Sequence, residues 1–268
     1  MKFKNDITML IFSCDKFSDL WNTHVELLEQ YWKDRGIRTI IVTDKDSDAN
    51  FDNVEVFCAG ASLEFSERLN SVLGQITTKY IFVTLDDYFL IKNVDSNNIE
   101  YLYNIMEKEN IQYMRLFPNP RRATAKKMNN YNGIYWINTS DTYSVNLYAG
   151  IWTKDFMQQT IKEVMNPWQY EVSLFKTATE LNARCAVSKN NEFIILDVVR
   201  KGKILYSADK YLKKHDIKLE TKREVHSLKY QILEDTRGFI LVHMPKKLYY
   251  FARRIFIMFG MHSYSSEE

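Results

Sequence analysis

Two adjacent carboxylates, Asp86 and Asp87, directly follow the apolar run Tyr80–Leu85. The run is mostly β-branched or aromatic, which predicts a buried strand. Open α/β sheets bind ligands just beyond the carboxyl ends of their strands, so this pair would lie where chemistry takes place. Hard divalent cations take carboxylate oxygens as ligands and usually bridge to substrate phosphates. The pair therefore predicts a divalent-cation site, with a solvated acidic turn as the alternative.

Polar side chains also follow two other apolar runs, Ile7–Ser13 and Thr39–Thr43, which both predict buried strands. The side chains that would line the same crevice are those of Ser13, Asp15, Lys16 and Asp44. Asp44 could bond a base or ribose, although a turn aspartate is the alternative. Between the two runs, Leu20–Trp32 has helical spacing, and Asp19 is placed to cap that helix. Strand, polar loop and helix together open a βαβ unit.

An arginine lies on the helix predicted shortly before the Asp-Asp strand. The segment Ser62–Ile76 has an apolar stripe, and Ser62 is placed to cap it. Arg68 lies on this helix, and an arginine that points at the crevice is a natural partner for a diphosphate. The alternatives are a solvated side chain or a pair with Glu64.

The middle of the chain predicts a helix over Asn98–Asn110 and a strand over Ile111–Phe117. The segment Pro118–Asp141 carries basic residues and a polar run rich in Asn and Tyr, which predicts a long loop. After this loop we expect an ordered segment over Ser144–Trp152, and Asp155–Met165 predicts another helix.

A second candidate for chemistry begins at Pro167, which fits the first position of a helix running to Leu181. Trp168 and Glu171 are three residues apart, on one face of that helix. An aromatic ring beside a carboxylate suits a sugar hydroxyl, because the ring stacks on the sugar and the carboxylate takes the proton. The alternative is a tryptophan that anchors the helix and a glutamate that caps it.

The last third of the chain predicts a strand over Phe193–Val199 and then a basic turn at Arg200–Lys203. His226 is a lone histidine, which is more often structural than a ligand. Pro245–Met261 combines four basic residues with an apolar stripe and contains no acid. That pattern is typical of a helix lying in an anionic membrane surface, with a terminal helix packed on the core as the alternative.

Composition narrows the class of protein. The chain has 268 residues, of which 46% are hydrophobic and 26% charged, as in ordinary globular proteins. A formal net charge of +2 is too small to suggest a nucleic-acid partner. The three cysteines have no metal-ligand spacing and leave one over if paired, which favours a reducing compartment. No apolar signal core or membrane-length run is present, so we expect a cytoplasmic protein with possible peripheral membrane contact.

With these residues in place, the chain resembles the GT-A glycosyltransferases that use nucleotide-diphospho-sugars. More narrowly, it resembles bacterial enzymes that build capsule, O-antigen or exopolysaccharide chains. The matching pieces are Ile11-Phe12-Ser13-Cys14-Asp15-Lys16-Phe17-Ser18-Asp19-Leu20-Trp21, Arg68-Leu69-Asn70, Tyr80 to Asp87, Pro167 to Glu171, and the basic turn near Gly202. The chain departs from the family in two ways: Leu85 precedes Asp86 where an Asp-X-Asp motif is usual, and Leu69 splits the family's Arg-Asn pair.

The resemblance implies an α/β fold with a mixed, mostly parallel central sheet flanked by helices. The GT-A-like catalytic domain would span residues 1–205, and residues 206–268 would form a helical extension that contacts a membrane or a partner. It also implies a Mn²⁺ or Mg²⁺ ion held by Asp86 or Asp87, which neutralises the leaving diphosphate. Arg68 and Lys16 would share that charge. The side chains facing the donor would be those of Ser13, Asp15, Lys16, Asp44 and Arg68.

For the transfer step, the resemblance implies that Glu171 deprotonates a hydroxyl of a glycan or lipid-linked acceptor, with inversion at the anomeric carbon. Trp168 would contact that acceptor. Two other classes stay open. A nucleotidyltransferase would also use a strand-end aspartate and a metal, but the N-terminal region has no Gly-rich, Lys-bearing phosphate loop. A non-catalytic scaffold that binds sugar or membrane would keep the fold without turnover.

Overall fold

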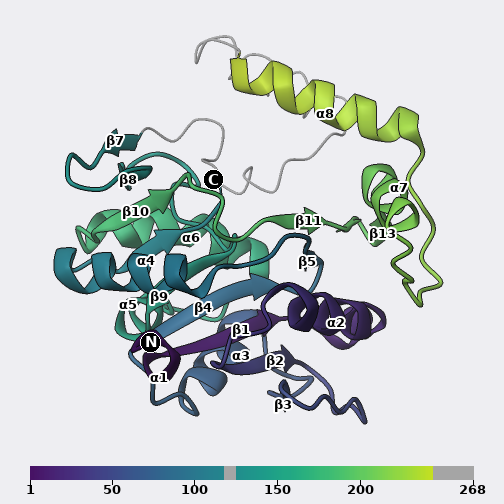
Figure 1. Ribbon diagram of the computed structural model, residues 1–268, viewed down its shortest axis with the longest axis horizontal. Helices are drawn as coiled ribbons and strands as arrows, with labels where there is room; N and C mark the ends of the chain where they lie inside the picture. The colour runs from purple at the N-terminus through teal and green to yellow at the C-terminus, as the bar shows by residue number, and fades with distance from the viewer. Residues whose placement is uncertain (118–124, 244–268) are drawn as a thin grey trace.

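The computed structural model describes residues 1–117 and 125–243, and for residues 237–243 only the backbone. A nine-stranded sheet forms the centre (Figure 1). Its order is β3 (Glu55–Cys58), β2 (Arg38–Thr43), β1 (Ile7–Phe12), β4 (Tyr80–Leu85), β9 (Gly150–Thr153), β6 (Tyr113–Arg115), β10 (Cys185–Ser188), β8 (Ile134–Ile137) and β7 (Ala125–Lys127). Among these strands β9 and β8 run opposite to the other seven. The predicted mixed, mostly parallel α/β sheet is confirmed.

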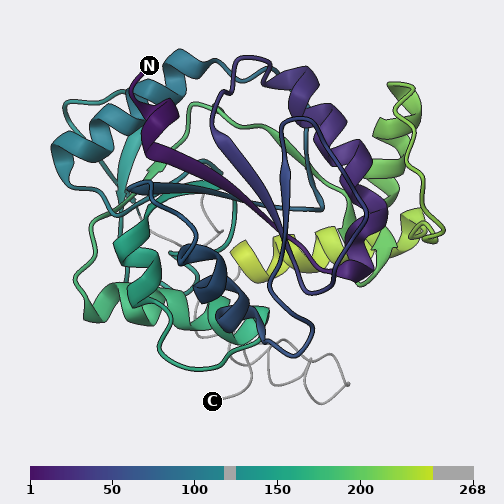
Figure 2. The same ribbon diagram turned by 90° about the horizontal axis from the view of Figure 1, so that it is seen from below.

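Helices cover both faces of the sheet, as the view from below shows (Figure 2). One face carries α1 (Phe3–Asp6), α2 (Trp21–Tyr31) and α4 (Ser96–Glu109), and the other α3 (Phe65–Leu73), α5 (Lys154–Gln159) and α6 (Pro167–Glu180). Alternation along β1 decides the division: Met9 and Ile11 pack under α2 and α4, while Leu10 and Phe12 pack under α3 and α6. Both faces are therefore buried, which accounts for the continuous apolar run of this strand.

A smaller apolar cluster holds residues 196–219 against the sheet. Short strands β5 (Tyr88–Leu90) and β11 (Ile195–Asp197) pair antiparallel, and β12 (Val199–Arg200) pairs with β13 (Lys203–Ile204). Helix α7 (Tyr206–Lys214) buries Ala208 and Leu212 in a cluster with Leu20 from the 3₁₀ helix η1 (Asp15–Leu20) and with Leu27 from α2. Residues 206–214 thus pack directly on the sheet domain.

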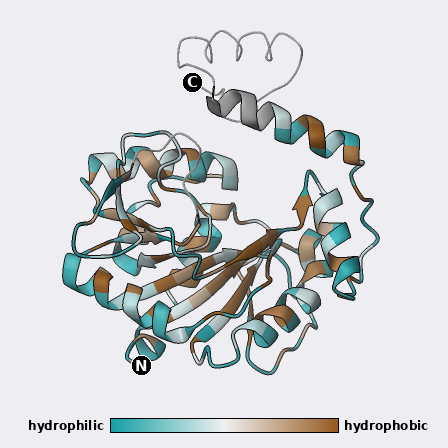
Figure 3. Cartoon of the chain, turned by 45° about the horizontal axis from the view of Figure 1, so that its top comes forward, coloured by the Kyte–Doolittle hydropathy of each residue, from teal (hydrophilic) through white to brown (hydrophobic). Residues whose placement is uncertain are grey.

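The last described helix, α8 (Leu228–His243), presents apolar side chains to the surface. Leu228, Ile232 and Leu233 are all exposed, and Figure 3 shows this helix with hydrophobic segments away from the brown core of the sheet. Among the described residues, none of the helices has the length and apolar character needed to cross a membrane. The basic stretch 245–261 lies outside the described residues.

The long loop predicted over Pro118–Asp141 is interrupted by two short strands, so the prediction is wrong at those residues. Residues 125–127 and 134–137 form β7 and β8, which extend the sheet by antiparallel pairing. Ile134 and Ile137 are buried at the two ends of β8, with half-buried Tyr135 and Trp136 between them. The strand lacks the apolar–polar alternation that would have indicated it.

Three predicted helix ends also need correction. Helix α3 begins at Phe65, because Glu64 forms a capping box with Glu67, so Ser62 is not its cap. Helix α2 has no side-chain cap, and Asp19 binds another residue described below. Helix α5 ends at Gln159, where the Thr160 hydroxyl donates to the Met157 carbonyl at 2.6 Å and ends the predicted helix early.

Candidate active site

The carboxyl ends of three parallel strands bring the predicted site residues together. Phe12 is in register with Leu85 on β4 and with Val42 on β2, so Ser13, Asp86 and the end of β2 are neighbours. The Asp86 N–H donates to the Phe12 carbonyl at 3.1 Å, and the Ser13 N–H to the Val42 carbonyl at 2.9 Å. Parallel pairing thus continues one residue past the strands and fixes the positions of both side chains.

Asp86 is held by a buried network. Its carboxylate, 6% exposed, accepts a hydrogen bond from the Ser13 hydroxyl, which in turn accepts one from the Trp21 indole N–H at 2.7 Å. Burial raises the pKa of Asp86 to about 7, against the opposing effect of the Ser13 hydrogen bond. Asp86 therefore has little freedom to turn toward a ligand.

A buried histidine supports the backbone of the same residue. The Nδ1 atom of His24 lies 3.1 Å from the Asp86 carbonyl oxygen. Burial lowers the pKa of His24 to about 4, so the ring is neutral at physiological pH. Because a carbonyl oxygen only accepts, Nδ1 carries the proton and donates it.

Asp87 has a different environment. Burial raises the pKa of its carboxyl well above the usual range, and the charges of Asp86 and Asp197 raise it further. Its Oδ1 atom is buried and has no hydrogen-bond partner among the described residues. Its carbonyl accepts from the Val198 N–H at 2.9 Å, so the end of β11 is held against it. An orphaned carboxylate oxygen beside a second carboxylate is a costly arrangement unless a ligand satisfies it.

A hydrogen bond links Asp44 and Asp15, which follow β2 and β1 at the carboxyl edge of the sheet. The Asp15 N–H donates to Asp44 Oδ1 at 2.7 Å, and Lys45 Nζ lies 2.9 Å from Asp15 Oδ2. Burial alone would raise the pKa of Asp44, but the hydrogen bond from Asp15 and the charge of Arg68 lower it below the usual value. Asp44 is therefore ionised, and the structure joins it to the loop that carries Asp15 and Lys16.

The two predicted cations differ in burial. Arg68 is half-buried on α3, and its Nε atom is buried without a hydrogen-bond partner among the described residues. Its charge acts on both Asp44 and Cys14, which puts the guanidinium at the same edge. It does not make a described ion pair with Glu64, whose carboxylate belongs to the capping box. The Lys16 side chain is exposed, next to these residues in the loop.

Glu171 approaches the edge from the α6 side. Asn166 caps α6 in a box with Gln169, and Pro167 occupies the first turn as predicted, which places Glu171 in the second turn. The Leu147 N–H donates to Glu171 Oε1 at 3.4 Å. Leu147 precedes β9, which runs antiparallel to β4, so it lies at the same edge as Asp86. Burial raises the pKa of Glu171, as suits a carboxylate that takes up a proton.

Two tyrosines connect Glu171 with Asp87. Tyr88 and Tyr148 pack with ring centroids 6.1 Å apart. Burial raises the pKa of Tyr88, and so do the nearby charges of Asp87, Asp197 and Glu171. The charges of these three carboxylates therefore all act on Tyr88.

Trp168 and His226 lie apart from this group. Trp168 is 53% exposed, so α6 leaves the indole at the surface while Glu171 is half-buried. His226 Nε2 lies 2.8 Å from the Arg200 carbonyl oxygen, and the ring stacks on Tyr230 at 3.9 Å. His226 thus supports the hairpin that carries Arg200 and does not contact the strand-end carboxylates directly.

The structure adds residues that the sequence reasoning missed. They are Trp21, His24, Tyr88, Tyr148 and Asp197. A signal existed for Asp197, an acid within the predicted strand Phe193–Val199, three residues before Arg200 of the basic turn, with which it pairs at 2.7 Å. For His24, Tyr88 and Tyr148, nothing local in the sequence distinguishes them from ordinary core residues.

The described residues contain no cluster of three or more histidine, cysteine or acidic side chains suited to a metal ion. The donor set at the sheet edge nevertheless fits a divalent cation that takes the rest of its ligands from a phosphate. The evidence is the orphaned Asp87 Oδ1, a hard oxygen donor, with the Asp86 carboxylate next to it in the chain.

No protein-family model matches the chain, and no curated protein does. Among solved structures, it is similar to S. aureus TarS 1–349 in complex with UDP-GlcNAc, with a TM-score of 0.51 and 11% identity over 74% of this chain and 60% of that one. A mannosyltransferase from Pyrobaculum calidifontis in complex with GDP-Man and Mn²⁺ has a TM-score of 0.48 and 9% identity, over 74% and 58%. A UDP-glucose pyrophosphorylase complexed with UDP-glucose has a TM-score of 0.45 and 12% identity, over 70% and 91%.

These likenesses show the fold alone. The sheet and its helices are GT-A-like, as the resemblance implied, and the chain spans less than two thirds of the TarS 1–349 structures. In open α/β folds, ligands bind at the carboxyl edge of the sheet. In this chain Asp86 and Asp87 lie at that edge, and Glu171 reaches it through its contact with Leu147.

Proposed function

We propose that the chain is a nucleotide-sugar-dependent, inverting glycosyltransferase of the GT-A type. The observation that carries the proposal is the meeting, at one sheet edge, of a carboxylate pair and a third, half-buried carboxylate from another element. One orphaned oxygen on Asp87 suits a cation with its phosphate, and Glu171 suits a proton acceptor. The GT-A-like fold, shared with a TarS structure that holds UDP-GlcNAc, supports the same substrate class.

The donor would lie along the ends of β1, β2 and β4. Asp44 and Asp15 face the nucleoside, and Ser13 holds Asp86 in place. Arg68 and Lys16 share the charge of the diphosphate, with the unpartnered Arg68 Nε available to donate to it. Asp87 would be the main ligand of a Mn²⁺ or Mg²⁺ ion, because Asp86 is already hydrogen-bonded by Ser13. When bound, that ion supplies charge neutralisation at the leaving diphosphate.

Glu171 would act as the general base. Its carboxylate takes the proton of an acceptor hydroxyl while the hydroxyl oxygen attacks the anomeric carbon. The bond to the nucleoside diphosphate breaks on the opposite side, and the diphosphate leaves with the bonding electrons, which inverts the configuration. A positioned base of this kind contributes about 10²- to 10⁴-fold to the rate.

The acceptor would be a glycan or lipid-linked oligosaccharide in the synthesis of a bacterial surface polysaccharide, in the cytoplasm. Trp168 would offer its exposed ring to this acceptor, and His226 would contribute only through the Arg200 hairpin. Residues 1–205 would form the catalytic domain. Residues 206–268 would form the extension, whose basic stretch 245–261 would lie against an anionic membrane.

A donor panel tests the proposal. The purified chain is incubated with UDP-, GDP-, CMP- and dTDP-sugars, with and without Mn²⁺, and thermal unfolding and release of free sugar are measured without acceptor. At least one donor should stabilise the protein in a metal-dependent way and be slowly hydrolysed. If no donor stabilises the chain, the proposal is wrong. If the chain instead forms nucleotide-sugar from a nucleoside triphosphate and a sugar phosphate, it is a nucleotidyltransferase; binding without any turnover would indicate a scaffold.

A further inference from the structure

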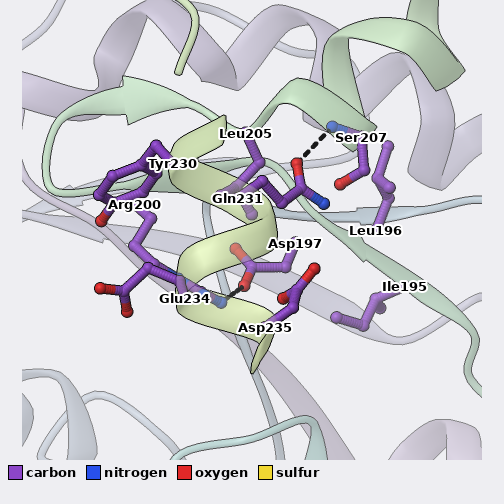
Figure 4. Close-up of a pocket in the computed structure, with 10 residues that line it drawn as sticks. All are labelled: Ile195, Leu196, Asp197, Arg200, Leu205, Ser207, Tyr230, Gln231, Glu234 and Asp235. Carbon is purple, nitrogen blue, oxygen red and sulfur yellow. Dashed lines mark hydrogen bonds and ion pairs between the residues drawn. The ribbon is translucent and has the colours of Figure 1, made fainter. Parts of the chain in front are cut away.

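A pocket of about 230 Å³ lies between α8 and the strand segment Ile195–Asp197 (Figure 4). Its polar lining comes from Asp197 and Arg200 on one side and from Gln231, Glu234 and Asp235 of α8 on the other. The apolar lining comes from Ile195, Leu196 and Leu205. Polar groups that converge over an apolar surface are typical of a small-molecule site.

The pocket adjoins the carboxylate edge. Asp197 is in register with Tyr88 in the pairing of β11 with β5, and Tyr88 directly follows Asp87 in the chain. The Val198 N–H then binds the Asp87 carbonyl at 2.9 Å. A ligand that contacts Asp197 from the pocket would therefore lie close to the segment that carries Asp87.

Its walls are fixed before any ligand arrives. Gln231 Oε1 accepts from the Ser207 N–H at 2.8 Å, which ties α8 to the start of α7. Arg200 holds Asp197 at 2.7 Å, and Tyr230 stacks on His226 at 3.9 Å. Figure 4 shows the Gln231 and Asp197 side chains on the same side of α8, with both interactions dashed. Preorganised walls reduce the entropy lost on binding.

Size and charge together restrict the ligand. Drug-sized ligands occupy pockets of roughly 300 to 1,000 Å³, so this cavity suits a single sugar unit. Carboxylate and amide groups are the partners that sugar hydroxyls need. Three acids, Asp197, Glu234 and Asp235, face one base, Arg200, so an anionic sugar is disfavoured and an amino sugar is favoured.

We propose that the pocket under α8 binds one neutral or amino-bearing sugar unit of the acceptor. The identification of this sugar as part of the acceptor rests on the proposed glycosyltransferase function. Binding of the sugar itself does not require a donor. Helix α8 then belongs to the substrate site, in addition to any role of the residues that follow it in membrane contact.

Ligand-observed NMR tests this directly with the full chain. The probes are the methyl glycosides of glucosamine, glucose and glucuronic acid, added without donor. We expect binding in the order glucosamine, glucose, glucuronic acid. Ser207→Trp should fill the pocket from the exposed position next to Gln231 and abolish binding of all three. Asp235→Lys should move the preference toward the glucuronide, because it reverses one of the three negative charges.

Leu233→Ala is the matched control, since Leu233 is 66% exposed on the same helix and does not line the pocket. It should bind the probes as the unmodified chain does. The inference is overturned if no glycoside binds the unmodified chain, or if neither Ser207→Trp nor Asp235→Lys changes the order or strength of binding. Donor-induced thermal stabilisation is recorded for the same variants. If donors fail to stabilise the unmodified chain although glycosides bind, the proposed function alone is contradicted. If donors stabilise it but no glycoside binds, the proposed sugar site alone is contradicted.

Discussion

Arg223 binds Asp19 with two nitrogen atoms: Nε donates to Oδ2 and a terminal nitrogen to Oδ1, each at 2.8 Å. The guanidinium also donates to the carbonyl of Lys16 and, at 3.2 Å, to that of Gly202. It lies 4.4 Å from the ring centroid of Phe17. One side chain thus joins the loop after β1 to the β12–β13 hairpin.

These two segments flank the carboxylate pair. The loop follows Ser13, which holds Asp86, and the hairpin follows Asp197, which lies beside Asp87. A bidentate arginine fixes the distance between two such segments well, because its two parallel hydrogen bonds restrain orientation as well as separation.

Arg223→Ala should lower the free energy of unfolding by about 1.5 to 3 kcal/mol, the range for hydrogen bonds to charged groups. The guanidinium is only 13% exposed, so solvent replaces little of what is lost. Urea denaturation measures the change. The control is Glu224→Gln on the same segment, where the pair with Lys203 is exposed to solvent and should contribute little to stability. Equal effects of the two variants would contradict a special role for Arg223.

The same pair predicts a pH dependence. Burial alone would raise the pKa of Asp19, but the hydrogen bonds from Arg223 and Thr221 lower it below the usual value of 3.8. A carboxyl with a lowered folded-state pKa stabilises the protein above its unfolded pKa, and this contribution is lost as the pH falls through the folded value. The stability difference between the unmodified chain and Asp19→Asn should therefore be constant near neutral pH and shrink in acid. A difference that grows in acid would contradict this assignment.

The sheet and its edge could be predicted from the sequence because their signal is local. Tyr80–Leu85 and Ile7–Phe12 are buried on both faces, so each gives an uninterrupted apolar run. Parallel pairing of such runs then forces the residues after them, Ser13 and Asp86, to one edge. Pro167 likewise fixes the start of α6 by its own covalent geometry.

What could not be predicted depends on contacts between distant residues. Nothing near Asp19 in the sequence indicates that its carboxylate binds Arg223, some 200 positions away, and does not cap the start of α2. His24 has the spacing of a core residue, and only the pairing of β1 with β4 brings it to the Asp86 carbonyl. Strand β8 was missed because Ile134–Ile137 is a run of only four residues within a polar stretch, and its pairing with β10 joins segments far apart in the chain.

Asp87→Asn should nearly abolish transfer and remove the metal dependence of donor binding, without lowering the unfolding temperature. The reason is that burial disfavours the charged carboxyl of Asp87, so an amide of the same shape costs the fold nothing. Asp86→Asn should have a milder effect on donor binding, since its carboxylate mainly accepts from Ser13. Isothermal titration of donor with and without Mn²⁺ compares the two. Full activity of both variants, or full activity in EDTA, would refute the metal site.

Deletion of residues 245–268 should release the chain from anionic vesicles. The stretch 245–261 carries four basic residues, and each contributes about 1 kcal/mol near such a surface. The deletion leaves α8 and its pocket residues in the chain, so transfer to a soluble acceptor should persist. Vesicle sedimentation and the unfolding temperature are measured together. A truncated chain that no longer folds would show that this stretch packs on the core and would contradict the membrane interpretation.

Glu171→Gln is the variant that separates an inverting transferase from the other classes. Glutamine keeps the shape of the side chain and can still accept from the Leu147 N–H, but it cannot take up a proton. Transfer should fall by about 10²-fold or more, on the scale of a lost general base. Donor binding, which lies on the β1, β2 and β4 side, should stay as it is, and so should the unfolding temperature.

The pH profile of the unmodified chain gives a second measurement of the same group. Burial raises the pKa of Glu171 above the usual value of 4.5, and only the ionised form can act as a base. The rate of transfer should therefore fall as the pH drops through that raised pKa, and the Glu171→Gln variant should lose this dependence along with its activity. If the variant keeps transfer per folded molecule but unfolds at a lower temperature, Glu171 serves the junction between α6 and Leu147, and the base is another residue.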